Sequence, residues 1–168
     1  MKRALLLLLA LAACSQTEDT GGNGTVQVDL ERAAIAAGIV RDPAETDITG
    51  LYARDTDRVC IVPEIVGYSI GATTDFGDGI GCSGQGTVTR SGETLHVEFK
   101  NADGCSFDAR FDGERIDFPG RLPEPCKKLC SVRASFAALE ADLLSDSIAE
   151  AATLRDGRGR MLCRSDDG

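Results

Sequence analysis

The spacing of apolar residues changes along this chain, and the change predicts two kinds of structure. From Asp29 to Val40, apolar residues recur at helical spacing, with Asp29 placed as an N-cap and Gly38 near the end. From Thr49 to about Gly120, apolar and polar residues alternate instead. Alternation with a period of two is typical of strands that have one buried and one solvated face. We therefore predict one short helix followed by a run of strands.

The clearest alternation places Leu95, Val97 and Phe99 on one face, with His96 and Glu98 on the other. Similar short segments recur, separated by turn residues, which favours an antiparallel meander. The expected fold is mainly β: an antiparallel meander or small barrel with short flanking helices. The strand candidates are Gly50–Arg54, Arg58–Val62, Tyr68–Thr73, Gly84–Arg90, 94–99, 106–111 and 115–118.

Two dipeptides, Ser91-Gly92 and Asp112-Gly113, have the composition of two-residue hairpin loops. If each forms the centre of its turn, the register of the flanking strands follows. The second register places Arg110 opposite Arg115, which is unfavourable. Asn101-Ala102-Asp103-Gly104 predicts another turn. The apolar pairs expected across the two hairpins are Val88 with Leu95, Ala109 with Ile116, and Phe107 with Phe118.

The end of the domain shows mixed patterns. Ser131 to Leu144 has apolar residues at helical spacing, which predicts a helix. Ser147-Ile148-Ala149-Glu150 fits a capping box and favours a second short helix. The dipeptide Asp156-Gly157 favours instead a final hairpin that returns Cys163 to the sheet. Between helix and strand for the last segment, we favour strand.

The first fourteen residues have the order of an export signal. Lys2 and Arg3 are followed by an apolar run that ends at Leu11-Ala12-Ala13-Cys14. The run is shorter than the roughly 20 residues that span a bilayer. Leu-Ala-Ala-Cys resembles the lipobox of bacterial lipoproteins. That resemblance implies cleavage before Cys14, acylation of Cys14, and outer-membrane sorting because Ser15 rather than aspartate follows.

The alternative is ordinary secretory cleavage after Ala12, because Ala10-Leu11-Ala12 also has small residues at the required positions. The number of cysteines decides between the two. The chain has seven, so ordinary cleavage leaves one unpaired thiol in an oxidising compartment. Lipidation removes Cys14 from the set and leaves an even number, which favours lipidation.

The remaining cysteines predict three disulfide bonds, with fifteen possible pairings that the sequence does not distinguish. Cys126 and Cys130 have a spacing that would place both on one helix face. Zinc binding there is the alternative, but the chain has only one histidine, and we expect no metal and no cofactor. The disulfide candidates are Cys60, Cys82, Cys105, Cys126, Cys130 and Cys163.

These features divide the chain into three parts. Residues 1–13 are the expected signal peptide, and residues 14–28 are a lipidated, Gly-rich and flexible tether. Residues 29–168 form a single disulfide-braced, mainly β domain. The formal charge of the chain is −9, with 27 acidic and 18 basic residues. Because such a surface repels phosphate backbones, we expect no nucleic-acid partner.

Few residues suggest chemistry. His96 is the only histidine, and the alternation places it on the solvent face beside Glu98. We favour a surface histidine over a general base. Asp75-Phe76-Gly77-Asp78-Gly79 has the acid spacing of a partial calcium loop, but its twelfth position, Gly86, lacks the required glutamate. An ordered turn is the preferred interpretation, and we predict no catalytic residue.

The expected function follows from location and from these exclusions. We expect a cell-envelope lipoprotein held on the outer membrane by the palmitate-type anchor on Cys14, with the domain facing the periplasm or the cell surface. Its expected role is a non-enzymatic binding or inhibitory module. The acidic body suits a cationic envelope or host protein. The alternatives are a structural envelope protein without a dissociable ligand and, less favoured, an enzyme.

Overall fold

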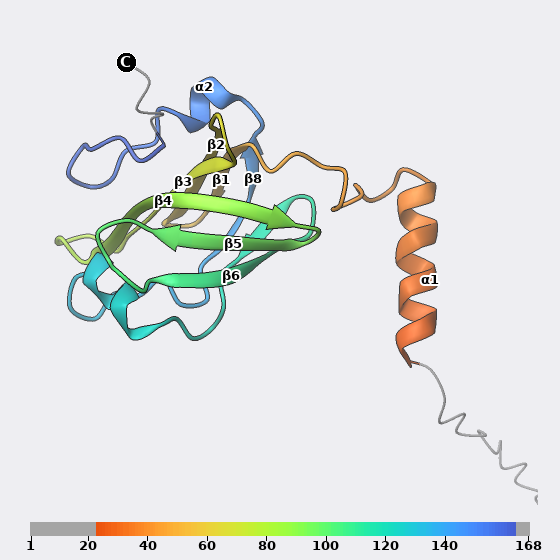
Figure 1. The fold of residues 1–168 in the computed structure, drawn as a ribbon, viewed down its shortest axis with the longest axis horizontal. Coiled ribbons are helices and arrows are strands. Elements are labelled where there is room, and N and C mark those ends of the chain that lie inside the picture. The colour runs from red at the N-terminus through yellow and green to blue at the C-terminus, as the bar shows by residue number, and fades with distance from the viewer. Residues whose placement is uncertain (1–22, 164–168) are drawn as a thin grey trace, which may run out of the picture.

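Eight antiparallel strands form a closed barrel in which each strand pairs with the next and the last pairs with the first. The computed structural model describes residues 23–163. Figure 1 shows the strands wrapped around a common interior. The predicted mainly β fold is confirmed, and the barrel form holds rather than an open meander. The strands are β1 (Gly50–Arg54), β2 (Asp57–Pro63), β3 (Tyr68–Asp75), β4 (Gly81–Ser91), β5 (Thr94–Phe99), β6 (Ser106–Phe111), β7 (Arg115–Asp117) and β8 (Glu140–Ser145).

The interior of the barrel is filled by apolar side chains. Alternate residues of β5 point inward and are buried, as the sequence predicts. Phe107 packs against Phe118 with ring centroids 4.9 Å apart, and Phe99 stacks on Phe136 at 5.6 Å. The Tyr52 hydroxyl donates to the Ile48 carbonyl at 2.7 Å, and burial raises the pKa of Tyr52. The interior is therefore a packed core, as in other small barrels.

The predicted helix over Ser131–Leu144 is wrong. Residues 140–145 form strand β8, and residues 131–139 lead into it. Ala141 is buried opposite Ile116, while Leu143 lies opposite Tyr52, so β8 closes the barrel between β7 and β1. Ala141 and Leu143 alternate with polar residues as in a strand. Phe136 and Leu139, upstream of them, also match a helical spacing with Leu143, and this favoured the helix in the sequence pattern. Barrel closure removes two exposed strand edges, which favours the strand.

The two predicted hairpin registers are each shifted by two residues. Ser91 pairs with Thr94, and Arg110 pairs with Asp117. The central dipeptides are therefore Gly92-Glu93 and Gly113-Glu114, with φ of 61° at Gly92 and 101° at Gly113. Only the first central residue needs positive φ, as in type II′ turns. The shift also places opposite charges across the second hairpin in place of Arg110 and Arg115. The expected pairs Val88–Leu95, Ala109–Ile116 and Phe107–Phe118 are replaced, and Val88 lies opposite Val97.

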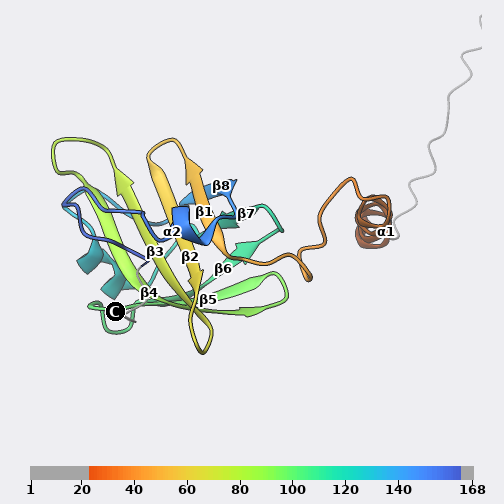
Figure 2. The same cartoon turned by 90° about the horizontal axis from the view of Figure 1, so that it is seen from above.

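The first helix begins earlier than predicted and stands apart from the barrel. Helix α1 (Asn23–Ala36) starts six residues before Asp29, so the prediction of Asp29 as the N-cap is wrong. The apolar spacing extends upstream through Val26, four residues before Leu30. Residues 23–28 of the expected tether are therefore helical. In Figures 1 and 2, α1 lies to one side of the barrel. No helix within residues 23–163 is both long and apolar enough to cross a bilayer.

The last described residues, 152–163, pack on the outer face of the barrel, and we call them the C-terminal segment. Helix α2 (Ile148–Ala151) precedes it, and the Ser147 hydroxyl accepts from the Glu150 amide, as the capping box predicts. The turn at Asp156-Gly157 forms, but only one isolated bridge accompanies it, so the predicted final strand is wrong. Leu162 is buried over β2 and β3 in a small apolar cluster outside the barrel.

Three disulfide bonds close the described part of the chain, as predicted. They pair all six candidates and leave neither Cys126 nor Cys130 available for zinc. Each bond contributes roughly 2–4 kcal/mol, mainly by restricting the unfolded chain. The pairs are Cys60–Cys163, Cys82–Cys130 and Cys105–Cys126, and the last two fix the 3-10 helix η1 (Glu124–Leu129) and its continuation to the barrel.

Candidate functional site

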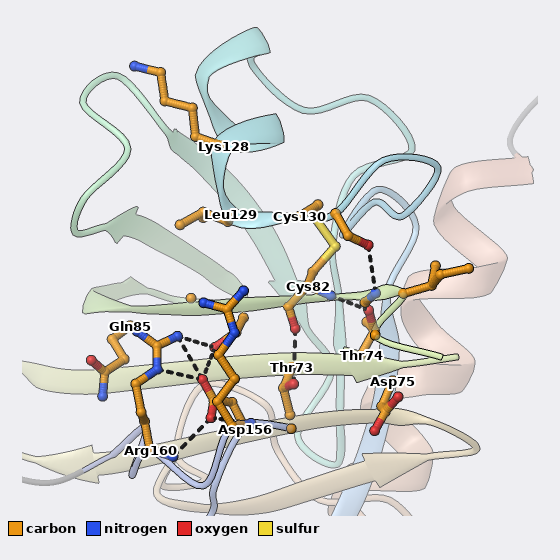
Figure 3. Close-up of a pocket in the computed structure, with 18 of the residues that line it drawn as sticks. Thr73, Thr74, Asp75, Cys82, Gln85, Lys128, Leu129, Cys130, Asp156 and Arg160 are labelled. Carbon is orange, nitrogen blue, oxygen red and sulfur yellow. Dashed lines mark hydrogen bonds and ion pairs between the residues drawn. A yellow bond between two sulfur atoms is a disulfide. The ribbon is translucent and has the colours of Figure 1, made fainter. Parts of the chain in front are cut away.

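A cleft of about 530 Å³ lies outside the barrel, beside strand β4. This volume falls within the range of ordinary ligand pockets, about 300–1,000 Å³. Its walls come from four parts of the chain: the β3–β4 hairpin, the turn after β5, residues 128–131 at the end of η1, and the loop 156–160 of the C-terminal segment. Figure 3 draws lining residues from β3 and β4, from residues 128–130 and from the C-terminal segment.

The wall formed by residues 128–131 is held to β4 by covalent and hydrogen bonds. The Cys82–Cys130 disulfide joins the two directly. The Ser131 hydroxyl accepts from the Gly81 amide at 2.9 Å, and the Ser131 amide donates to the Gly81 carbonyl at the same distance. Thr73 donates from its hydroxyl to the Cys82 carbonyl at 2.9 Å. This wall is therefore fixed before any ligand arrives.

The opposite wall is held by one buried carboxylate, Asp156, whose side chain is only 2% exposed. One carboxylate oxygen accepts from the backbone amides of Arg158 and Arg160, both at 2.9 Å. The other accepts from the Ser83 hydroxyl at 3.0 Å and from Arg160 Nε at 2.8 Å. Burial alone would raise the pKa of Asp156, but the bonds from Arg160, Ser83 and Arg158 together lower it. The ionised carboxylate therefore anchors the loop to β4.

The third wall is the loop that joins β3 and β4, for which the sequence predicts an ordered turn. Asp75 accepts from the Gly77 amide at 2.9 Å, and Phe76 donates from its amide to the Ile80 carbonyl. Asp78 and Gly79 adopt positive φ values of 53° and 72°. The prediction of an ordered turn is confirmed. No cluster of metal-ligating side chains occurs within residues 23–163.

The cleft concentrates unpaired positive charge in an acidic protein. Lys100, Lys128 and Arg158 line it, are exposed, and make no side-chain ion pair with any described residue. Arg160 is also exposed, at 61%, but is paired with Asp156. In Figure 3, Lys128 belongs to the wall formed by residues 128–131, Arg160 to the opposite wall, and Asp75 to the β3–β4 hairpin. The unpaired cations therefore come from three of the four parts that line the cleft, and the β3–β4 hairpin contributes Asp75 and Asp78 instead.

His96 lies on the outer face of the barrel beside Glu98, as predicted, and it also joins a hydrogen-bonded group. Its Nδ1 lies 2.8 Å from Asp108 Oδ1, and its Nε2 lies 3.1 Å from the Ser106 hydroxyl. The sequence pattern within β5 does not predict these two partners, because they come from β6. A correct β5–β6 register identifies the pair His96–Asp108.

The order serine, histidine, aspartate is the one that serine hydrolases use. Here, however, the side chains of His96 and Asp108 are 50% and 67% exposed, and neither residue lines the cleft. Acyl transfer depends on donors preorganised around the developing oxyanion in a site that excludes water. The Glu98 carboxylate also lies 3.9 Å from Nε2, on the side of the serine. This setting favours a hydrogen-bonded surface group over a catalytic triad.

Comparison with protein-family models, with curated proteins and with solved structures gives no match for this chain. The functional argument therefore rests on the residues of the site. Cys14 and the expected signal peptide lie outside the described residues, so their roles remain predictions from sequence.

Proposed function

We propose that this chain is an outer-membrane lipoprotein whose barrel domain is a non-enzymatic binding module, with the cleft beside β4 as its contact site. The observation that carries the proposal is that the barrel interior is filled, whereas the cleft lies outside the barrel. Four phenylalanine rings pack together in the barrel interior, while the cleft lies on the outside. A filled barrel interacts through its surface rather than by enclosing a ligand.

The rigidity of the cleft supports the same proposal. Disulfide bonds tie two of its walls to the barrel: Cys82–Cys130 holds the wall of residues 128–131, and Cys60–Cys163 holds the end of the C-terminal segment. A preformed site loses less conformational entropy when a ligand binds. The lipid expected on Cys14 and the segment that follows would hold this site near the membrane.

Site-specific photo-crosslinking in the native envelope tests the proposal. A photoreactive residue placed at Gly157, in the cleft, is expected to give one discrete adduct. Gly157 suits this purpose because a Cβ there meets only Asp75, at 3.7 Å. The control is the same residue at Ile65, which is exposed in the turn between β2 and β3 and does not line the cleft. Equal adducts from both positions, or none from Gly157, would contradict the proposal.

A second surface favours the cationic partner expected from the overall charge. Glu98 and Asp108 are 65% and 67% exposed on the outer face of β5 and β6, away from the cleft. A cationic protein such as a lysozyme would bind this acidic face by long-range attraction that salt screens. Pull-down of lysozyme should then weaken with added salt and with Glu98→Gln. Binding that ignores salt would remove this candidate.

A further inference from the structure

The cleft combines two opposite chemical features, and together they restrict its ligand. Three cations, Lys100, Lys128 and Arg158, line it without an ion pair among the described residues. Two exposed carboxylates, Asp75 and Asp78, line it from a different segment, the β3–β4 hairpin. A ligand that satisfies both the cations and the carboxylates carries several negative charges and a donor group such as an amine.

The three cations come from three different segments of the chain. Lys100 follows β5, Lys128 belongs to η1, and Arg158 belongs to the C-terminal segment. Phosphate sites usually gather backbone amides and side chains around a single group. Separate cations on separate walls instead match carboxylates spaced along a chain. Arg160 adds little free charge, because its guanidinium already pairs with Asp156 at 2.7 Å.

The loop acids distinguish among polyanions. A uniformly anionic polymer would place negative charge against Asp75 and Asp78, which is unfavourable. A peptide with acidic side chains can direct its amino terminus to these carboxylates. We propose that the cleft binds an acidic peptide, an inference that rests on the proposed function. The side-chain carboxylates of the peptide would lie toward Lys100, Lys128 and Arg158. Its amino terminus would lie toward Asp75 and Asp78.

The chain offers a matched control for the cationic wall. Lys127 is adjacent to Lys128 and carries the same charge, but it is paired with Glu124 at 2.9 Å and does not line the cleft. Lys128→Gln and Lys127→Gln change the net charge equally. A difference between them therefore reports position and not total charge. Both side chains are exposed, so neither substitution threatens the fold.

The test measures fluorescence anisotropy of a hexaglutamate peptide, labelled at its carboxyl end, with the full acylated protein in detergent. Replacing Lys100, Lys128 or Arg158 singly by glutamine should weaken peptide binding roughly 2- to 5-fold, as expected for the loss of an exposed charge pair. Lys127→Gln should leave binding unchanged. Acetylating the peptide's amino terminus should weaken binding to the unmodified protein but not to Asp75→Asn.

Other results would overturn the proposal. If Lys127→Gln weakens peptide binding as much as Lys128→Gln does, the attraction is unspecific. If the protein binds an oligogalacturonate of the same charge as tightly as the peptide, the ligand class is a polyanionic glycan. Failure of this inference is separable from failure of the proposed function. If the Gly157 crosslink still forms after the three substitutions, the cleft remains the proposed binding site, but an acidic peptide is excluded as its ligand. If the unmodified protein gives neither a Gly157 crosslink nor peptide binding, both the proposed function and this inference are rejected.

Discussion

Replacing Asp156 by asparagine should release the loop that forms one wall of the cleft. The amide oxygen can still accept from the Arg158 and Arg160 backbone amides. The amide nitrogen, however, would face the Arg160 guanidinium and the Ser83 hydroxyl, which both donate to the carboxylate. Net contributions of hydrogen bonds to charged groups are about 1.5–3 kcal/mol each. We therefore expect the free energy of loop opening to fall by about 2–3 kcal/mol.

Hydrogen exchange at individual amides is the appropriate assay, because the Cys60–Cys163 disulfide keeps the end of the segment attached. At fixed pH, a loss of 2–3 kcal/mol corresponds to exchange that is roughly 30- to 150-fold faster. The affected amides are those of Arg158 and Arg160. Asp78→Asn is the matched control, because Asp78 lines the same cleft and no described group is bonded to its side chain.

The contribution of Asp156 should also depend on pH in a defined direction. Its pKa in the folded protein is lowered, relative to about 3.9 in the unfolded chain. The unfolded state therefore binds more protons near that pH, and the stabilisation is complete above the unfolded pKa. It disappears as the pH falls through the folded pKa. Equal exchange in Asp156→Asn and the unmodified protein at pH 7, or a difference that grows in acid, would refute this reasoning.

Three further predictions test other parts of the molecule. Gly71→Ala should lower the free energy of urea unfolding by about 1–3 kcal/mol, because an added Cβ would lie 2.5 Å from Leu162 Cβ. Gly120→Ala is the control and should have little effect, because no atom of the described residues lies within 4 Å of a Cβ added there. Cys14→Ser should abolish incorporation of a labelled palmitate analogue and move the protein to the soluble fraction. A fluorophosphonate probe should not label Ser106, and labelling that depends on His96 would instead favour the enzyme alternative.

The local sequence predicted strands β1 to β7, and the alternation of buried and exposed positions is clearest in β5 and β6, each of 6 residues. Strand β8 was missed because its pattern is short and follows Phe136 and Leu139, which belong to the core but lie outside any strand. Only pairing with β1 and β7, distant in sequence, distinguishes the two interpretations. The hairpin registers were wrong for a different reason: the prediction put Gly92 and Gly113 second in their turns, whereas the residue with positive φ is the first central one.

The cleft could not be predicted from the sequence, because no short window contains more than one of its walls. Cys82 and Cys130 are 48 residues apart, and Cys60 and Cys163 are 103 apart. The number of cysteines predicted three bonds but not which walls they join. The turn at Asp156 was predicted from Asp-Gly alone. The spacing from Asp156 to Arg160 is the local signal that would have indicated a carboxylate anchor.

The barrel and the C-terminal segment thus have different roles. The strands bury their inward side chains in a packed core, and this leaves the outer face of β3 and β4 as the place where a site can form. Gly71 has no side chain, which lets the C-terminal segment approach β3 closely, with Leu162 directly above it. Gln85 holds the same segment to β4 by donating from its side chain to the Met161 carbonyl. A larger side chain at Gly71 would lift the segment and remove one wall of the cleft while leaving the barrel closed. Variants of the segment can therefore separate loss of binding from loss of fold, which substitutions in the core cannot.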